Sequence, residues 1–473
     1  MSSIEGRAMR NSDVLSDFAG GLEFNRLPPE VIERAKAVII DTIACIVGGT
    51  TSAPARPVIE LTSALSGADQ ASVLGTRIRT GVVDAVYCNT YLADVLDYED
   101  TIVSHPSAAT VPASLAIAEL AGASGPELIA AVVAGYEVGV RVQRAIMPTY
   151  ERRLLVQTEY SWLSFAAVSS AARLLGLPQA AWRDAFGYAA QSSPVPGLGS
   201  SPTRPMSWIK GNFSGQASVG VRGALLADRG FRTAHDVLES AKGYAAVMGS
   251  DSWDPEILTR GLGQTWAILG SQLKPYPCCR FIHPALDAIG MIRRQRAFDP
   301  AEVVEVRVHT FDILVDEFDV KHPESVIDGQ FSVPFTTALA VLDIPAGIEW
   351  WGERDLLHDP QVLEMSTRVR LLRHAESERL EATERRHSAT VDIELVDGTV
   401  LTARQDTARG GPEAPLSAEE VRAKFINLTA PVLTQARAQA AFESLTNIES
   451  VSDVRDVIAM LTPSSSSEAL AAT

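Results

Sequence analysis

The sequence is poor in cysteine and contains no long apolar run. Its 473 residues include only Cys45, Cys88, Cys278 and Cys279, whose spacing matches neither a zinc finger nor an iron–sulfur motif. The longest apolar stretches, such as AVIIDTIACIVGG at 37–49, are interrupted by charge and too short to cross a bilayer. These absences argue against a disulfide framework, a metal site and a membrane span. They predict a soluble, cytoplasmic protein.

Basic residues are outnumbered and form no run. The chain has 41 Lys and Arg against 58 Asp and Glu, a formal net charge of −17. Nucleic acids and anionic membranes bind clustered Lys and Arg, so neither is expected as a partner. A small anionic substrate remains possible, because it needs only a local basic pocket. The hydrophobic content of 46% allows a large core.

Helical patterns dominate the first 270 residues. Residues 27–49 begin with proline, show apolar residues at helical spacing and end at Gly-Gly. Residues 125–146 and 162–178 are rich in Ala, Gly and Ser, which is typical of buried, closely packed helices. This part of the chain is therefore expected to be an all-helical domain.

The pattern changes after residue 271. Residues 303–311 alternate between apolar and polar side chains, as a half-buried strand does. In 388–404, two alternating runs flank Asp397-Gly398, a strong hairpin signal. Ser417 and Glu420 then form a capping box that begins a new helix.

These patterns predict a mostly α fold: a large all-helical domain formed by both chain ends, plus a smaller α+β lid domain. The first part of the helical domain is expected at residues 9–271 and the α+β lid at 272–412. The C-terminal part of the helical domain is expected at 413–462, followed by a flexible tail at 463–473.

A polar cluster interrupts an apolar, alanine-rich segment at 92–120. It contains four acids, a hydroxyl and a histidine: Asp94, Asp97, Glu99, Asp100, Thr101 and His105. Asp97, Thr101 and His105 would share one face of a helix, although Pro106 favours a loop there. Histidine carries protons near neutral pH, and a carboxylate can fix its tautomer. The alternative is a capped helix end followed by a structural loop histidine.

Two further segments carry candidate cations. In PMSWIKGNFSG (205–215), Lys210 lies beside aromatic surface and glycines and could bind a carboxylate; otherwise its stem simply covers Trp208. In KPYPCCRFIHP (274–284), Lys274 and Arg280 lie at the predicted domain junction, where clefts often bind small ligands. The alternative there is a rigid, proline-punctuated hinge.

Together these segments resemble the MmgE/PrpD family, which includes 2-methylcitrate dehydratases, cis-aconitate decarboxylases and iminodisuccinate epimerase. The resemblance covers roughly residues 12–462. Six motifs occur in the family's order: LDYEDT with HPS, AARLLGL, WIKGNFSGQASVGVRGALLADRGF, KPYPCC with HPALDAI, DGQFSVPF and PLSAEEVRAKF.

The resemblance implies a homodimer with an active site between the two domains and with neither a metal nor an organic cofactor. It gives the catalytic positions to Asp97, Thr101, His105 and Lys210. The predicted substrate-binding residues are Lys274, Arg280, Gln157 and Ser332.

The chain also departs from the family pattern. Asp94 stands where a histidine is common, and Gln157, Phe213 and Phe335 stand where the family has His, His and Tyr. The loop between Thr101 and His105 is about two residues shorter.

The sequence thus favours a lyase, and first a dehydratase of a citrate-like hydroxy-polycarboxylate. In this hypothesis His105, oriented by Asp97, moves a proton next to a carboxylate, while Lys210 and Arg280 stabilise the developing charge. The alternatives are an epimerase or decarboxylase of a related polycarboxylate, or a non-catalytic paralogue that binds a carboxylate.

Overall fold

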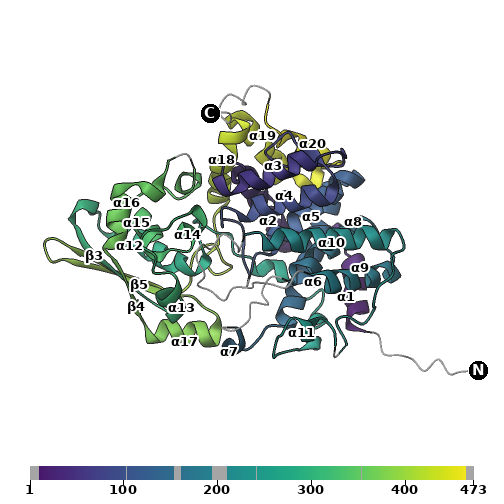
Figure 1. The fold of residues 1–473 in the computed structure, drawn as a ribbon, viewed down its shortest axis with the longest axis horizontal. Coiled ribbons are helices and arrows are strands. Elements are labelled where there is room, and N and C mark those ends of the chain that lie inside the picture. The colour runs from purple at the N-terminus through teal and green to yellow at the C-terminus, as the bar shows by residue number, and fades with distance from the viewer. Residues whose placement is uncertain are drawn as a thin grey trace, which may run out of the picture.

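Helices form most of the molecule (Figure 1). The computed structural model describes residues 10–102, 104–153, 161–193, 210–240, 242–352 and 354–464. The described elements up to residue 270 are helices, with one exception. Two short antiparallel strands, β1 (Ala71–Ser72) and β2 (Arg79–Thr80), form a hairpin that the sequence did not predict. The helices of this part are α1 (Asn11–Gly20), α2 (Pro29–Gly49), α3 (Arg56–Leu65), α4 (Val82–Asp94), α5 (Pro106–Ala121), α6 (Gly125–Ala145), α7 (Tyr150–Arg153), α8 (Leu163–Leu174), α9 (Gln179–Ser192), α10 (Asn212–Asp228) and α11 (Tyr244–Val247).

Small residues let the central helices α5, α6, α8 and α10 pack closely. A Cβ atom added to Gly135 of α6 would lie 2.4 Å from Thr110 Cγ2 of α5. One added to Gly220 of α10 would lie 2.6 Å from the carbonyl oxygen of Ser164 in α8. Larger side chains at these positions would force the helices apart. The small-residue pattern thus predicted buried helices correctly.

The C-terminal helices return to this helical part, on the side of α2 and α3 (Figure 1). They are α18 (Ala418–Leu433), α19 (Gln435–Thr446) and α20 (Arg455–Met460). The predicted capping box of α18 is confirmed, with Ser417 and Glu420 satisfying each other's backbone N–H groups. A buried ion pair joins α18 to α2, because Lys424 Nζ lies 2.7 Å from Asp41 Oδ1.

The other end of the molecule contains a four-stranded sheet with the order β4-β3-β5-β6 (Figure 1). Strands β3 and β4 are parallel, whereas β3–β5 and β5–β6 are antiparallel. The predicted hairpin is present, and Gly398 takes the left-handed φ of 81° that its turn requires. The elements here are α12 (His283–Gln295), β3 (Val303–Thr310), α13 (Asp312–Glu317), α14 (Val326–Gln330), α15 (Val333–Val341), α16 (Pro360–Thr367), β4 (Val369–Arg373), α17 (Ala375–Glu384), β5 (Ala389–Leu395) and β6 (Val400–Gln405).

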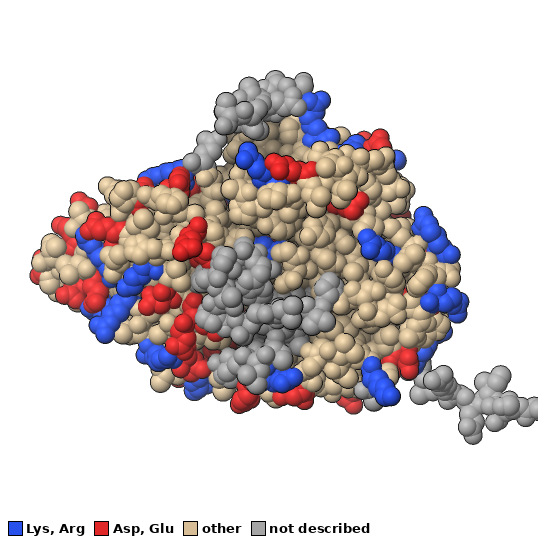
Figure 2. Space-filling view, viewed as in Figure 1, with Lys and Arg blue, Asp and Glu red and all other residues tan. Residues whose placement is uncertain are grey.

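The fold is thus mostly α with a small mixed sheet, while the division into domains at the predicted bounds stays a prediction. Within the described residues, no helix combines the length and apolar character needed to cross a bilayer. Basic and acidic side chains are interspersed over the face shown in Figure 2.

Candidate active site

Three separate segments of the chain meet at the polar cluster. Helix α4 ends at Asp94, and α5 begins after His105, so the described residues between them form no continuous helix through Asp97, Thr101 and His105. Asp97 has a left-handed φ of 52°, which is uncommon for a residue with a side chain. Lys210 lies just before α10, and Lys274 lies in the segment before α12.

Two buried lysines share one carboxylate. Lys210 Nζ lies 2.9 Å from Asp94 Oδ1 and 2.5 Å from Asp97 Oδ1. Lys274 Nζ donates to Asp97 Oδ2 and to the Asp97 carbonyl oxygen, both at 3.0 Å. Side-chain exposure is 2% or less for all four residues. Asp97 therefore holds two buried ammonium groups side by side.

These contacts keep both lysines charged. Burial alone would raise the pKa of Asp97, but the ammonium groups of Lys210 and Lys274 hold it below its usual value. Burial would lower the pKa of Lys210, but the carboxylates of Asp94 and Asp97 raise it. The pKa of Lys274 is raised in the same way, by Asp97 and Glu99. For Asp94, burial outweighs Lys210 and raises the pKa.

The carboxylate that orients His105 is Glu99. Glu99 Oε1 lies 2.5 Å from His105 Nδ1, and the Glu99 side chain is fully buried. Burial lowers the pKa of His105, so the imidazole is neutral near pH 7 and donates its Nδ1–H to Glu99. The expectation that Asp97 orients His105 is therefore wrong, because both oxygens of Asp97 are bonded to the lysines.

Two aromatic side chains, Phe213 and Phe331, lie beside the polar groups. The ring of Phe213, at the start of α10, lies 5.2 Å from the His105 ring. Lys210 Nζ lies 5.8 Å from the centre of the Phe331 ring. Phe335 is buried against Trp351, with ring centres 6.1 Å apart. The two replacements that fall within the described residues, Phe213 and Phe335, thus supply apolar surface instead of proton carriers.

Thr101 connects the cluster to the segment that carries Lys274. Its backbone N–H donates to the Gln272 carbonyl at 3.0 Å, and the Gln272 N–H returns a bond to the Thr101 carbonyl at 2.8 Å. The Thr101 hydroxyl donates to the Ser104 carbonyl at 2.8 Å. Thr101 thus holds the loop in place, while its oxygen can still accept a hydrogen bond.

Two predicted substrate-binding residues have other partners. The Arg280 guanidinium donates to Gln272 Oε1 and to the carbonyls of Ala408 and Arg409, at 3.0, 3.0 and 2.6 Å. These bonds join two chain segments and use N–H donors on all three guanidinium nitrogens, the donors that would otherwise bind a carboxylate. The buried Ser332 hydroxyl caps α15 by accepting the Phe335 N–H at 3.0 Å.

Neither of these two side chains contacts the lysine cluster through a described hydrogen bond. Of the two other predicted substrate-binding residues, Lys274 is part of the cluster, and Gln157 lies outside the described residues.

Lys424 supports the site from the C-terminal helix, a role that the sequence did not suggest. Its Nζ donates to the carbonyl oxygens of Tyr98 at 2.5 Å and Lys274 at 3.1 Å. It thereby joins α18 to the backbone beside Asp97 and at Lys274. In the sequence, the feature that could have pointed to Lys424 is its place as a single lysine on an otherwise apolar face of a helix, in the motif PLSAEEVRAKF.

Asp94, Glu99 and His105 also form a group with metal-binding geometry. One potential ligand atom from each residue lies within 4.8 Å of the others. The sequence predicted no metal because its cysteines and histidines show no ligand spacing. That reasoning did not cover a mixed set of two carboxylates and one imidazole.

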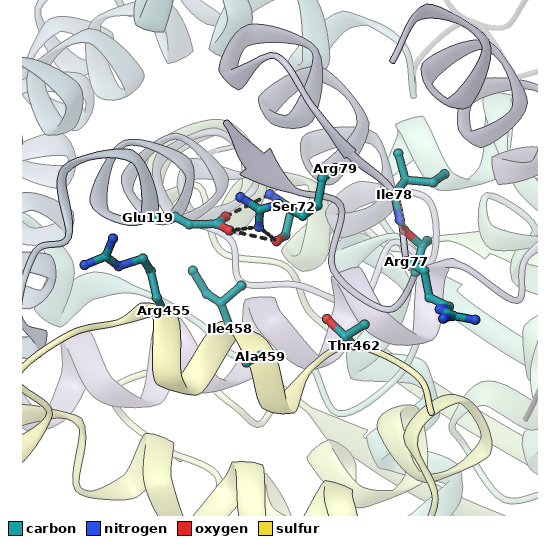
Figure 3. A pocket seen from close by; sticks show the side chains of 10 residues that line it. Ser72, Arg77, Ile78, Arg79, Glu119, Arg455, Ile458, Ala459 and Thr462 are labelled. Atoms are coloured by element: carbon teal, nitrogen blue, oxygen red, sulfur yellow. Dashed lines mark hydrogen bonds and ion pairs between the residues drawn. The ribbon is translucent and has the colours of Figure 1, made fainter. Parts of the chain in front are cut away.

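A separate cavity of about 230 Å³ lies between the β1–β2 hairpin and α20 (Figure 3). Arginines line it, but Glu119 accepts bonds from Arg79 and from the backbone and hydroxyl of Ser72. Arg455 pairs with Asp453. These charges are paired with one another, so the cavity is a weaker candidate than the lysine cluster.

The chain resembles known proteins over most of its length. Residues 13–256 match the MmgE/PrpD N-terminal domain, and residues 276–448 match the MmgE/PrpD C-terminal domain. The cis-aconitate decarboxylase of Aspergillus terreus (strain NIH 2624 / FGSC A1156) is 26% identical over 473 residues, which cover 94% of each chain. The Mus musculus cis-aconitate decarboxylase is 24% identical, covering 95% of this chain and 92% of the relative.

The Homo sapiens cis-aconitate decarboxylase is also 24% identical, covering 92% of this chain and 90% of the relative. Both family domains are matched in order; the first spans the segments that carry Asp94, Asp97, Glu99, His105 and Lys210, and Lys274 lies between the two matched ranges. The chain therefore belongs to the MmgE/PrpD family.

Proposed function

We propose that this protein is a lyase that decarboxylates an unsaturated tricarboxylate of the cis-aconitate type. The observation that carries the proposal is the pairing of one oriented histidine, His105, with two buried lysines, Lys210 and Lys274, in a single cluster. The similarity to cis-aconitate decarboxylases supports the substrate class. We therefore favour decarboxylation over the dehydration expected from the sequence.

The lysines can stabilise charge on the substrate. An ammonium group has three donors, and the described bonds engage two of them on each lysine. The third donor of Lys210 and of Lys274 can bind a carboxylate oxygen. A preorganised donor in a site closed to water stabilises developing negative charge strongly.

His105 supplies the proton. When the C–C bond to the leaving carboxylate breaks, carbon dioxide departs and the electron pair moves into an enolate-like system conjugated with a remaining carboxylate. The lysines stabilise that carboxylate, and a proton from His105 then adds to carbon. A bound polycarboxylate adds negative charge beside the imidazole and raises its pKa, so the ring takes up from solvent the one proton that each turnover consumes. His105 is 18% exposed, which permits this exchange.

Dehydration would place a further demand on the site. It needs a base for the C–H bond and an acid for the leaving hydroxyl. Among the described residues of the cluster, Phe213 packs on His105 at a position where the family pattern has a second histidine. One proton carrier is sufficient for decarboxylation.

The test is to incubate the purified protein with cis-aconitate in D₂O and to measure carbon dioxide and the deuterium content of the product. We expect carbon dioxide release with one deuterium added to carbon per turnover, and loss of both in His105→Asn. Water loss from citrate-like hydroxy acids without carbon dioxide release would favour the dehydratase. Binding of carboxylates without any reaction would favour the non-catalytic paralogue.

A further inference from the structure

The active-site cluster holds more buried carboxyl groups than ammonium groups. Three carboxylates, on Asp94, Asp97 and Glu99, meet two ammonium groups, on Lys210 and Lys274. The three acidic residues are at most 1% exposed, so water does not compensate the imbalance. A buried charge needs a partner. The two ammonium groups balance two of the three carboxyl groups, so the third is balanced either by a proton or by one more cation.

Among the described residues, two buried carboxylate oxygens of this cluster have no hydrogen-bond partner. Asp94 Oδ1 accepts from Lys210, and Glu99 Oε1 accepts from His105. The second oxygens, Asp94 Oδ2 and Glu99 Oε2, are buried and have no hydrogen-bond partner among the described residues. Buried polar atoms are almost always satisfied in folded proteins. Two unsatisfied acceptors in one cluster indicate a ligand that interacts with anionic oxygens.

The geometry fits a metal ion better than an organic cation. The potential ligand atoms of Asp94, Glu99 and His105 lie within 4.8 Å of one another. Opposite ligands of a metal with bonds of about 2.0–2.2 Å lie roughly 4 Å apart, so a small inward movement of the side chains closes the site. An imidazole nitrogen with two carboxylates suits Zn²⁺, whereas Mg²⁺ prefers oxygen ligands and several waters.

We propose that Asp94, Glu99 and His105 form a site for a divalent transition-metal ion of the Zn²⁺ type, and that an ion bound there inhibits the protein. Inhibition follows because the metal takes the imidazole lone pair and the Glu99 carboxylate, so His105 can no longer carry a proton. The inhibitory part rests on the proposed function, but the binding part does not.

The first test is calorimetric titration of the chelator-stripped protein with Zn²⁺ and with Mg²⁺. We expect one Zn²⁺ site per chain, at least tenfold weaker in Asp94→Asn and in Glu99→Gln, and no Mg²⁺ binding of comparable strength. The matched control is His358→Asn, which removes an exposed histidine–carboxylate pair with Asp355 and should leave the site unchanged. Zn²⁺ binding that is absent, or unaffected by the two cluster variants, would overturn the proposal; a proton would then balance the charge.

The second test uses the unmodified protein and does not depend on the folding of variants. Co²⁺ should produce visible absorption bands without the near-ultraviolet band of a thiolate ligand, because no cysteine belongs to the site. A thiolate band would place the ion elsewhere and refute the assignment.

The activity measurement separates the two proposals. If cis-aconitate is decarboxylated, stoichiometric Zn²⁺ should abolish the reaction, and a chelator should restore it. Zn²⁺ binding at the cluster without any decarboxylation would leave the metal site standing and refute the proposed function. Decarboxylation unaffected by bound Zn²⁺ would refute the inhibitory role.

Discussion

Glu99 and His105 form a buried carboxylate–imidazole pair, with Glu99 Oε1 2.5 Å from His105 Nδ1. The pair lies at the end of the loop between α4 and α5, with Phe213 packed against the imidazole. In the proposed reaction the Glu99 carboxylate accepts the Nδ1–H, which leaves the ring Nε2 as the atom that exchanges a proton with the substrate. Glu99 is thus a positioning residue for His105.

Replacing Glu99 should impair proton transfer more than substrate binding. We expect Glu99→Gln to lower kcat by roughly 100-fold, the order typical of a disrupted acid–base catalyst, with a small change in KM and a shifted pH profile. Steady-state kinetics across pH with cis-aconitate would measure this. A suitable control is Glu381→Gln, which alters another buried carboxylate paired with a histidine, His387, at 3.0 Å. An unchanged pH profile in Glu99→Gln would contradict the positioning role.

Lys210 should matter for both activity and stability. Lys210→Met leaves the buried Asp94 and Asp97 short of a counter-charge, which typically costs about 3–5 kcal/mol of folding free energy. We expect the double variant Lys210→Met with Asp94→Asn to recover much of the unfolding temperature but none of the turnover. If the double variant regains activity, Lys210 serves only to neutralise the carboxylate.

The stability of the sheet-containing part should fall as pH rises. Asp287 of α12 accepts bonds from Tyr276 and from the Arg409 N–H, and burial raises its pKa above the usual value. Between the pKa of Asp287 in the unfolded state and its higher pKa in the folded state, the folded protein keeps a proton that the unfolded chain releases. In this range the free energy of unfolding falls as the pH rises, by at most about 1.4 kcal/mol per pH unit. Relative to Asp287→Asn, the unfolding temperature of the wild type should fall as the pH rises above about 4, the ordinary pKa of an aspartate. A difference that is constant with pH would contradict the shift.

Removal of metal should not inactivate the protein. The proposed reaction uses His105 and the two lysines, and a metal at His105 would block it. We therefore expect EDTA to leave the activity unchanged or to increase it. Reproducible inactivation by EDTA, reversed by one divalent metal, would contradict both the expectation from the sequence and the inhibitory site.

We expect a homodimer, as the family resemblance implies. The alanine-rich helices α5, α6 and α8 do not offer an interface, because they are largely buried within the chain, where they pack on one another. Leu61 and Leu65 of α3 are 58% and 62% exposed and offer apolar surface instead. Light scattering at micromolar concentration would measure the assembly, and a stable monomer would contradict the expectation.

Much of the local structure was predictable because it depends on neighbouring residues. The helix at 29–49, the hairpin around Gly398 and the capping box of α18 all follow from short-range rules of spacing, backbone freedom and capping. The two-residue strands β1 and β2 were missed, because so short a pairing leaves no periodic pattern.

The segments that form the candidate site could be recognised from the sequence alone. Polar interruptions of apolar segments marked Asp97, His105 and Lys210, and the predicted domain junction marked Lys274; all four lie in the cluster.

Which of these residues form hydrogen bonds or ion pairs with one another depends on the tertiary structure. The left-handed backbone at Asp97 directs its carboxylate to lysines that are 113 and 177 positions away in the chain, and leaves Glu99 to bond to His105. Arg280 is drawn instead to carbonyls 128 and 129 positions away. Such contacts depend on how distant segments pack, and the spacing of residues along the chain does not encode them.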